Sequence, residues 1–285
     1  MRILLITVRP KLGLMLTLAF GLISLISAVF YSIAQAPGQP ESPAPLSNIR
    51  IVVDPGHGGV DGGCSYNQFL EKSLNLTVGR ILADDLTALG GRVRLTRSQD
   101  EALVPWGTPG GSRHKRDLAA RIQTAKDFDA HIFLSIHANA GPAHLGGALV
   151  FFHQGHEESK RLAGLIQERL EKLVPGNQNG ILPAQFMVLA QQQIPAVLIE
   201  IGFLTNPQDR EFLSSDAAPD LISKSIAAGV TAYVQGEQPA APTLSPYPAP
   251  QGDDPDLSPA LPYPGCLVID PHLPINTIEE ALARD

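Results

Sequence analysis

The sequence predicts a single α/β domain with a twisted, largely parallel β-sheet flanked by helices on both faces. Short β-branched or apolar runs alternate with longer runs whose apolar residues recur every three or four positions. Such alternation is typical of strand–helix–strand units, which bury a parallel sheet between two layers of helices. The run Ala196–Ile201 supports a buried strand, because it is apolar apart from one charge. The predicted domain occupies residues 49–236.

The elements of this domain follow from the apolar pattern. The first strand is Ile51–Val53, and a helix runs from Leu74 to Leu89, where a pair of glycines ends it. Arg92–Thr96 alternates like a strand. The later elements are a helix around 118–125, strands at 131–136 and 147–152, a helix over 162–173, the strand at 196–201 and a helix over 221–233. In sheets of this kind, ligands bind beyond the carboxyl ends of the strands.

Residues 1–36 precede the domain and carry an export pattern. An apolar run over residues 12–34 ends at the small-residue site Ala34–Ala36, and no acidic residue occurs before it. Three cations come before the run: Arg2, Arg9 and Lys11. The pattern predicts a secretory signal peptide, but the run is also long enough for a retained membrane anchor. Both alternatives place the domain outside the cytoplasm, in the periplasm or cell envelope, because the positive end stays inside.

Two segments flank the domain and are rich in proline. Residues 37–48 combine proline with small polar residues, which predicts an extended linker. Residues 237–285 repeat proline with little apolar material until a short run near the end. This composition buries too little surface to offset chain entropy, so a mostly disordered tail is expected.

Charge and cysteine content limit the classes of partner and fold. The net charge is −7, and residues 1–36 contribute three cations and no anions, so the remainder carries −10. This excludes nucleic acid as the main partner. The two cysteines, Cys64 and Cys266, form no disulfide framework, and whether they pair with each other stays open. Nothing indicates an obligate assembly, so a monomer is expected.

Three polar residues lie where predicted strands end or inside an apolar strand. His57 follows the first strand within a glycine-rich segment, His137 ends the strand at 131–136, and Glu200 interrupts the strand at 196–201. A histidine after a strand is more often structural than a ligand. An unpaired glutamate in a buried strand is costly, however, and needs a cation, a metal or a shifted pKa. The glycines near His57 fit a backbone that approaches another group closely.

Zinc explains these residues together. Zn²⁺ binds imidazole nitrogen and carboxylate oxygen, and its catalytic sites use three protein ligands and a water. Glu71, at the start of the first helix, is the candidate third ligand beside His57 and His137. An acid at this position also suits the helix dipole, so the alternative of a purely helical role stays open.

Other residues are weaker candidates. Cys64 offers a soft zinc ligand. His153 and His156 follow a predicted strand and are either surface residues or substrate contacts. Trp106 lies in a loop and either stacks on a sugar or docks on the domain.

Four segments, in this order, resemble the zinc-dependent N-acetylmuramoyl-L-alanine amidases: VVDPGHGGVDGG (52–63), FLEKSLNL (69–76), FLSIHANA (133–140) and PAVLIEIGFLTNP (195–207). The resemblance covers about residues 48–235. It implies that His57, Glu71 and His137 bind zinc and that Glu200 is the catalytic glutamate. It further implies hydrolysis of the amide bond between N-acetylmuramic acid and L-alanine in peptidoglycan, for wall remodelling or daughter-cell separation.

Details of the family pattern refine this expectation. Arg121 matches a recurrent arginine and is interpreted as structural. Regulated members carry a helical plug between the blocks of His137 and Glu200, whereas the interval here holds one strand, one amphipathic helix and a short segment at 186–189. We therefore expect an open site. Asn179 and the glycine after it stand near where many members carry an arginine, so a substrate contact there does not carry over.

Two alternatives compete with the amidase. A zinc peptidase or deacetylase of similar build would use the same ligands, and only the four matching segments argue against it. A non-catalytic wall-binding module would need an incomplete set of site residues, and all four are present.

Overall fold

The computed structural model describes residues 10–34, 43–66, 69–105, 112–174, 176 and 180–240. The chain divides into two units, Met1–Pro43 and Ala44–Asp285. The first unit contains helix α1 (Pro10–Ala34). A membrane anchor at residues 12–34 was one of two predicted alternatives; among the described residues, no helix reaches the length and apolar character that crossing a membrane requires.

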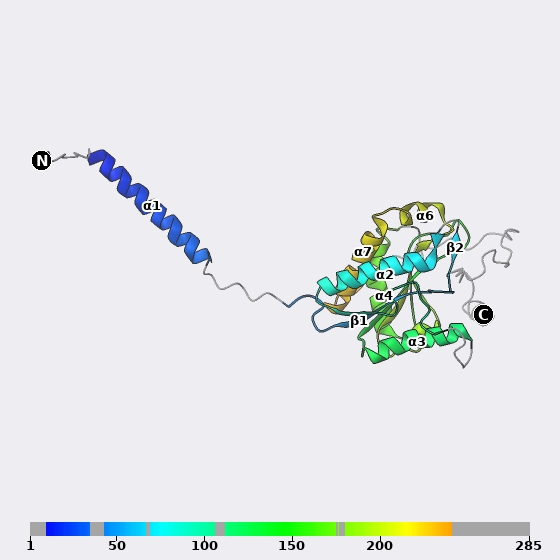
Figure 1. The fold of residues 1–285 in the computed structure, drawn as a ribbon. Helices are drawn as coiled ribbons and strands as arrows, with labels where there is room; N and C mark the ends of the chain where they lie inside the picture. The colour runs from blue at the N-terminus through cyan, green and yellow to red at the C-terminus, as the bar shows by residue number, and fades with distance from the viewer. Residues whose placement is uncertain are drawn as a thin grey trace. The chain divides into compact units, whose positions relative to one another are not determined.

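Six strands form the main sheet of the second unit, in the order β4-β1-β5-β8-β6-β7. Figure 1 shows this sheet between helices α2 and α3. Their bounds are β1 (Arg50–Pro55), β4 (Arg92–Leu95), β5 (Ile132–Asn139), β6 (Leu149–Phe152), β7 (Ile181–Pro183) and β8 (Ala196–Phe203). Neighbouring strands are parallel except β6 and β8, which pair antiparallel. The connection from β5 to β6 contains no helix, and a parallel return needs a crossover of a dozen or more residues. The predicted, largely parallel sheet is confirmed.

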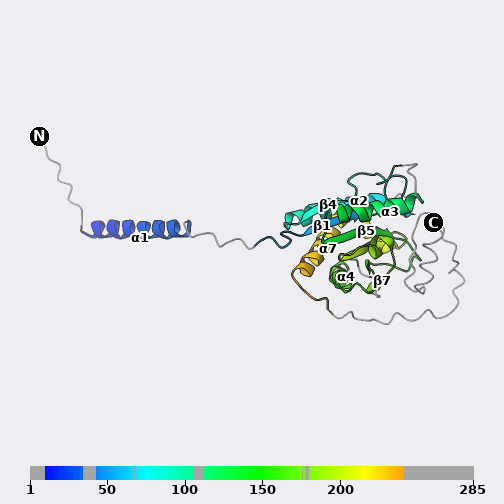
Figure 2. The same ribbon diagram turned by 90° about the horizontal axis from the view of Figure 1, so that it is seen from below.

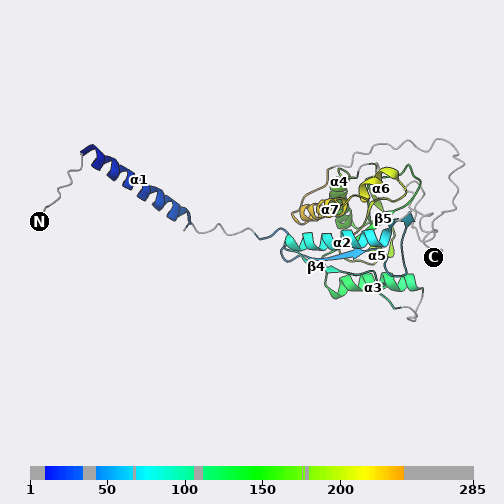
Figure 3. The same cartoon turned by 45° about the horizontal axis from the view of Figure 1, so that its top comes forward.

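Helices cover both faces of this sheet. Their bounds are α2 (Glu71–Ala88), α3 (Arg113–Asp127), α4 (Glu157–Leu170), α5 (Met187–Ala190), α6 (Pro207–Leu213) and α7 (Ala218–Val234). Helices α2, α4 and α7 pack together on one face, whereas α3 and α5 lie on the other (Figure 3). Figure 2 shows α7 beside α4. Alternate residues of β1 reach the two layers: Val53 joins the core under α2, and Val52 joins the core under α3. The predicted helices on both faces are confirmed.

Sequence analysis did not predict the shortest strands. A hairpin of β2 (Ser65–Tyr66) and β3 (Phe69–Leu70) precedes α2, and strand β7 extends the sheet beyond β6. These pieces contain too few residues to show a period of two or 3.6. Helix α3 begins at Arg113, earlier than its apolar spacing indicated. The residues of its first turn are basic, so the apolar pattern did not include them. The hydroxyl of Ser112 caps it by accepting a hydrogen bond from the Lys115 N–H at 3.3 Å.

The ends of the packed unit extend into segments predicted as linkers. Leu46 is fully buried, and its N–H donates to the Leu89 carbonyl at 3.0 Å. After α7, Pro239 packs so closely on helix α4 that a Cβ at Gly164 would lie 2.9 Å from its side chain. Linker residues 35–42 and tail residues 241–285 lie outside the described part of the chain.

Candidate metal centre

The candidate residues meet at the carboxyl ends of three adjacent parallel strands. Strand β5 pairs with β1 on one side and with β8 on the other, and in the second pairing His137 lies opposite Glu200. His57 follows β1 by two residues. The convergence that parallel strands predicted therefore occurs, and His137 and Glu200 share the sheet face that α3 and α5 cover.

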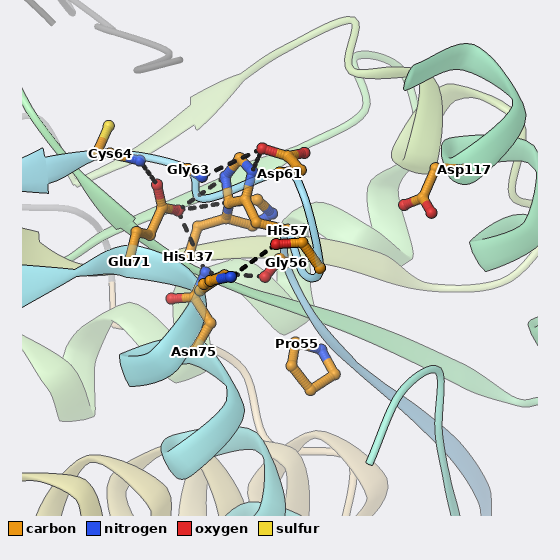
Figure 4. Close-up of polar contacts among 12 residues, drawn as sticks. Pro55, Gly56, His57, Asp61, Gly63, Cys64, Glu71, Asn75, Asp117 and His137 are labelled. Atoms are coloured by element: carbon orange, nitrogen blue, oxygen red, sulfur yellow. Dashed lines mark hydrogen bonds and ion pairs between the residues drawn. The ribbon is translucent and has the colours of Figure 1, made fainter. Parts of the chain in front are cut away.

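Three side chains form a compact group, with Glu71 between two imidazoles (Figure 4). Glu71 Oε1 lies 3.1 Å from His57 Nε2 and 3.0 Å from His137 Nδ1, and the ligand atoms of all three residues lie within 4.8 Å of one another. Zinc bonds of about 2.0–2.2 Å in a tetrahedron place two ligand atoms roughly 3.4 Å apart. The donor set and its spacing therefore fit a zinc ion.

Glu71 is the first residue of helix α2, and the residues around it fix its carboxylate. The Cys64 N–H donates to Oε2 at 2.7 Å, and the Ala138 N–H and the Asn75 amide each donate to Oε1 at 3.2 Å. Burial disfavours the charge, but the two histidines and these hydrogen bonds outweigh it, so the pKa of Glu71 lies well below its usual value. The carboxylate is ionised and aimed at the two imidazoles.

His57 sits in a tight turn in which its backbone is strained. Its φ of 60° is left-handed, which is rare for a residue with a side chain. The turn closes through two backbone hydrogen bonds between Gly58 and Asp61. The Asp61 carboxylate lies 2.9 Å from His57 Nδ1, which leaves Nε2 directed at Glu71. Burial opposes a charged imidazole, but Glu71 and Asp61 overcome it and raise the pKa of His57 to about 10.

Two glycines of this segment are required by the close approach of the ligands themselves. A Cβ at Gly56 would lie 2.2 Å from His137 Nε2. A Cβ at Gly63, whose φ is 64°, would lie 2.5 Å from Glu71 Oε2 and 2.6 Å from the His57 ring. The glycine-rich pattern therefore makes room for the side chains of the candidate metal ligands.

Glu200 differs from Glu71 although both are buried. Its Oε2 has no hydrogen-bond partner among the described residues, and 3% of its surface is exposed. Burial, reinforced by the charge of Glu71, raises the pKa of Glu200 well above its usual value. Burial likewise lowers the pKa of His137, despite its hydrogen bond with Glu71. A carboxyl group of raised pKa next to a group of candidate metal ligands suits general acid–base chemistry.

Arg121 braces the segment that carries His57. Its guanidinium lies 2.6 Å from Asp54 Oδ1 and 2.9 Å from Asp117 Oδ2, and it donates to the carbonyls of Pro55 and His57 at 3.0 and 2.8 Å. These contacts agree with the structural role expected for it.

The remaining candidates lie apart from the metal ligands or outside the described part of the chain. Phe152 of the antiparallel strand β6 pairs with Val197, so His153 lies toward the end of the sheet opposite the site. His156 caps α4, accepting a hydrogen bond from the Ser159 N–H at 3.1 Å. Cys64 is disulfide-bonded and is not among the three ligands. Trp106, Asn179 and Cys266 fall outside the described ranges.

Sequence analysis missed three residues that contact this site: Asp61, Asn75 and Arg97. Asp61 orients His57 and Asn75 contacts Glu71. Arg97 donates to the carbonyl of Gly56, next to His57. A signal existed for Arg97, because it follows a predicted strand, as His57 and His137 do. Asn75, inside a helix, offered none.

Comparisons with known proteins agree with this geometry. The Amidase_3 family model of N-acetylmuramoyl-L-alanine amidases matches residues 51–232. A germination-specific N-acetylmuramoyl-L-alanine amidase of Bacillus subtilis is 35% identical over 66% of this chain and 81% of its own. The CwlD amidase of Clostridioides difficile, solved in complex with the GerS lipoprotein, is 31% identical over 67% of this chain and all of its own, with a TM-score of 0.62. The catalytic domain of CwlV, an N-acetylmuramoyl-L-alanine amidase from Bacillus (Paenibacillus) polymyxa var. colistinus, is 26% identical over 66% of this chain and 98% of its own, with a TM-score of 0.55.

Proposed function

The chain belongs to the N-acetylmuramoyl-L-alanine amidase family and is a cell-wall hydrolase, and we propose that it works with a zinc ion held by His57, Glu71 and His137. The donor set of two imidazoles and one carboxylate supports zinc over magnesium or calcium, which prefer oxygen ligands. Zinc sites that take three protein ligands leave a fourth position for water, as hydrolysis requires.

The burial of the Glu200 carboxylate beside the candidate ligands is the observation that best supports hydrolysis at this site. It is buried, it has an oxygen without a partner among the described residues, and it lies opposite His137 in the sheet. A buried carboxylate of this kind costs stability, so a structural role does not explain it. A role in proton transfer does, because burial and the charge of Glu71 raise the pKa of Glu200, and a carboxylate of raised pKa is a stronger base.

Each residue of the site has its own role in the proposed hydrolysis. A zinc ion held by His57, Glu71 and His137 would supply Lewis-acid polarisation of the lactyl carbonyl of the muramic acid and would lower the pKa of a water to about 7. Glu200 removes the proton from the attacking water and then passes it to the departing amine of L-alanine. Asp61 holds the His57 ring in one orientation. His57 and His137 hold the pKa of Glu71 below its usual value, and the N–H groups of Cys64 and Ala138 donate to its carboxylate.

Location and regulation extend the proposal. Cell-wall amidases act outside the cytoplasm, and we assign residues 1–36 to export and the enzyme to the periplasm or cell envelope. Wall remodelling or daughter-cell separation is the process that this substrate suggests. Helix α4 buries Leu162, Leu165 and Ile166 against the sheet, which supports a core helix in the interval where a plug would stand and hence an open site. The monomeric state stays a prediction.

Digestion of purified sacculi tests the activity and its bond specificity together. The account predicts soluble peptides with a new amino-terminal L-alanine and glycan strands of unchanged length, with both the release and the new amino group lost on chelation. A peptidase would expose a different amino-terminal residue, a deacetylase would release acetate, and a binding module would release nothing. Any of these three results would refute the proposal.

A further inference from the structure

Arg97 follows strand β4 and is buried beside the segment that carries His57. Its exposed fraction is 2%, so a fully charged guanidinium lies inside the protein. Among the described residues its hydrogen-bond partners are all backbone carbonyls: Pro55 at 2.8 Å from Nε, Gln99 at 3.1 Å from Nη1, and Gly56 and Lys72 each at 2.8 Å from Nη2. The side chain therefore holds backbone segments together.

The two bonds of Nη2 join two of the metal ligands through their neighbours. Gly56 directly precedes His57, and Lys72 directly follows Glu71. A single nitrogen thus bridges the loop that carries one imidazole and the first turn of the helix that carries the carboxylate. The planar guanidinium fixes the directions of its N–H groups, which a lysine ammonium does not.

The loop closes tightly over this guanidinium. A Cβ at Gly58 would lie 2.9 Å from Arg97 Cδ and Nε. The same loop is also held by Lys72, whose ammonium donates to the Gly59 carbonyl at 2.7 Å. The left-handed backbone of His57 costs free energy and persists only where the surroundings hold it, and Arg97 supplies part of that support.

We propose that Arg97 is a positioning residue of the metal centre, which sets the separation between the His57 imidazole and the Glu71 carboxylate. Arg97 bonds to the backbone next to the two ligands and acts through Gly56 and Lys72. The inference rests on the proposed zinc site. Groups that orient metal ligands from outside commonly change metal affinity by about 10–100-fold when mutated.

Zinc affinity and ligand geometry test this role separately from folding. Zinc affinity is measured by competition with a chelator, and the coordination geometry by the visible absorption spectrum of the cobalt-substituted protein. R97K is expected to weaken zinc binding by about 10–100-fold and to change the cobalt spectrum. The matched control is R50K, because Arg50 starts strand β1, whose carboxyl end Arg97 contacts, and donates to the Asp129 carbonyl at the opposite end of that strand. R50K should leave both measurements unchanged.

Each outcome is decisive. R97K that loses stability but keeps wild-type zinc affinity and spectrum overturns the proposal. If R97K does not fold, R97Q is tested in its place. Zinc affinity and the cobalt spectrum are measured on R97Q, together with the rise of its unfolding midpoint on addition of zinc. Failure of both variants to fold in the presence of zinc also overturns it, since Arg97 would then be required by the fold itself. Wild-type protein that binds no zinc would instead refute the proposed function.

Discussion

Two arginine–aspartate ion pairs lie at opposite ends of strand β1. Their nitrogen–oxygen distances are equal, but their exposure to solvent differs. At the amino end, Arg50 lies 2.6 Å from Asp129, and the aspartate side chain is 90% exposed. At the carboxyl end, Arg121 also lies 2.6 Å from Asp54, whose side chain is 1% exposed. The first pair is screened by water, whereas the second keeps its charges inside the protein.

The difference shows where this fold accepts the cost of buried charge. Around the buried pair lie Glu71, Glu200 and Arg97, each with at most 3% of its surface exposed. Charges of this kind seldom add net stability compared with apolar side chains of similar volume. They are concentrated at the end of the sheet where His57, Glu71 and His137 form a group that could hold a metal ion.

The largest expected effect separates the two buried glutamates of this end. Glu200→Gln should lower kcat/KM by about 10²–10⁴-fold, because it removes the proton acceptor while the three ligands remain. Glu71→Gln should instead abolish tight zinc binding. Activity on sacculi and zinc content are measured on the same preparations. A Glu200→Gln enzyme with wild-type turnover would remove Glu200 from the chemistry.

The stability contributed by the buried pair of Asp54 and Arg121 should depend on pH in the acid range. Burial opposes the charge of Asp54, but Arg121 and the hydroxyls of Thr96 and Ser135 hold its pKa below the usual value. Since the folded pKa is lower than the unfolded value of about 3.9, the stability from ionised Asp54 is present above about pH 4 and is lost as pH falls below it.

Asp54→Asn is the matching variant. It should destabilise the protein by about 3–5 kcal/mol near neutral pH, because the Arg121 charge stays buried without its partner. The difference from wild type should shrink as pH falls below about 4. Denaturant unfolding at several pH values measures it. A difference that does not vary with pH would show that Asp54 is not the titrating group.

A smaller effect is expected from the aspartate that orients His57. Asp61→Asn keeps a similar shape but removes the negative charge beside Nδ1, and zinc affinity should fall by about 10–100-fold with the fold intact. Chelator competition measures the affinity. Unchanged zinc binding would mean that the strained turn alone orients the imidazole.

The smallest effect belongs to the exposed end of β1. Asp129→Asn removes the carboxylate partner of Arg50 and tolerates the left-handed backbone of this position (φ 49°), and an exposed pair of this kind contributes about 0–1 kcal/mol. Activity and zinc affinity should not change, and the free energy of unfolding from denaturant titration should fall by no more than this amount. A large loss of activity would break the distinction between the two ends.

Sequence patterns predicted the layers of the fold and the positions of the ligands, because both depend on strong local signals. Apolar runs such as Ala196–Ile201 mark buried strands, and parallel strands bring their carboxyl ends together. That His57 and His137 lie close together followed from that rule. The four-segment resemblance identified the bond that is cut.

Other features depend on contacts between distant parts of the chain and left weaker traces. The short strand β7 has no measurable period. Arg97 donates to the carbonyl of Gly56, far away in the sequence, so its role appears only when the chain is folded. Asn75 lies only four residues after Glu71, but nothing in the helical pattern marked its contact with that carboxylate. The glycines at 56 and 63 were recognised as markers of close approach, but the groups that approach them, His137 and Glu71, required the structure.

Zinc titration into chelated enzyme tests the central claim most directly. The account predicts that chelated protein is inactive and that activity returns in proportion to added zinc, reaching its full value at one ion per chain. Zinc content and release of peptides with amino-terminal L-alanine are measured on the same samples. Full activity in protein shown to contain no metal would contradict the account.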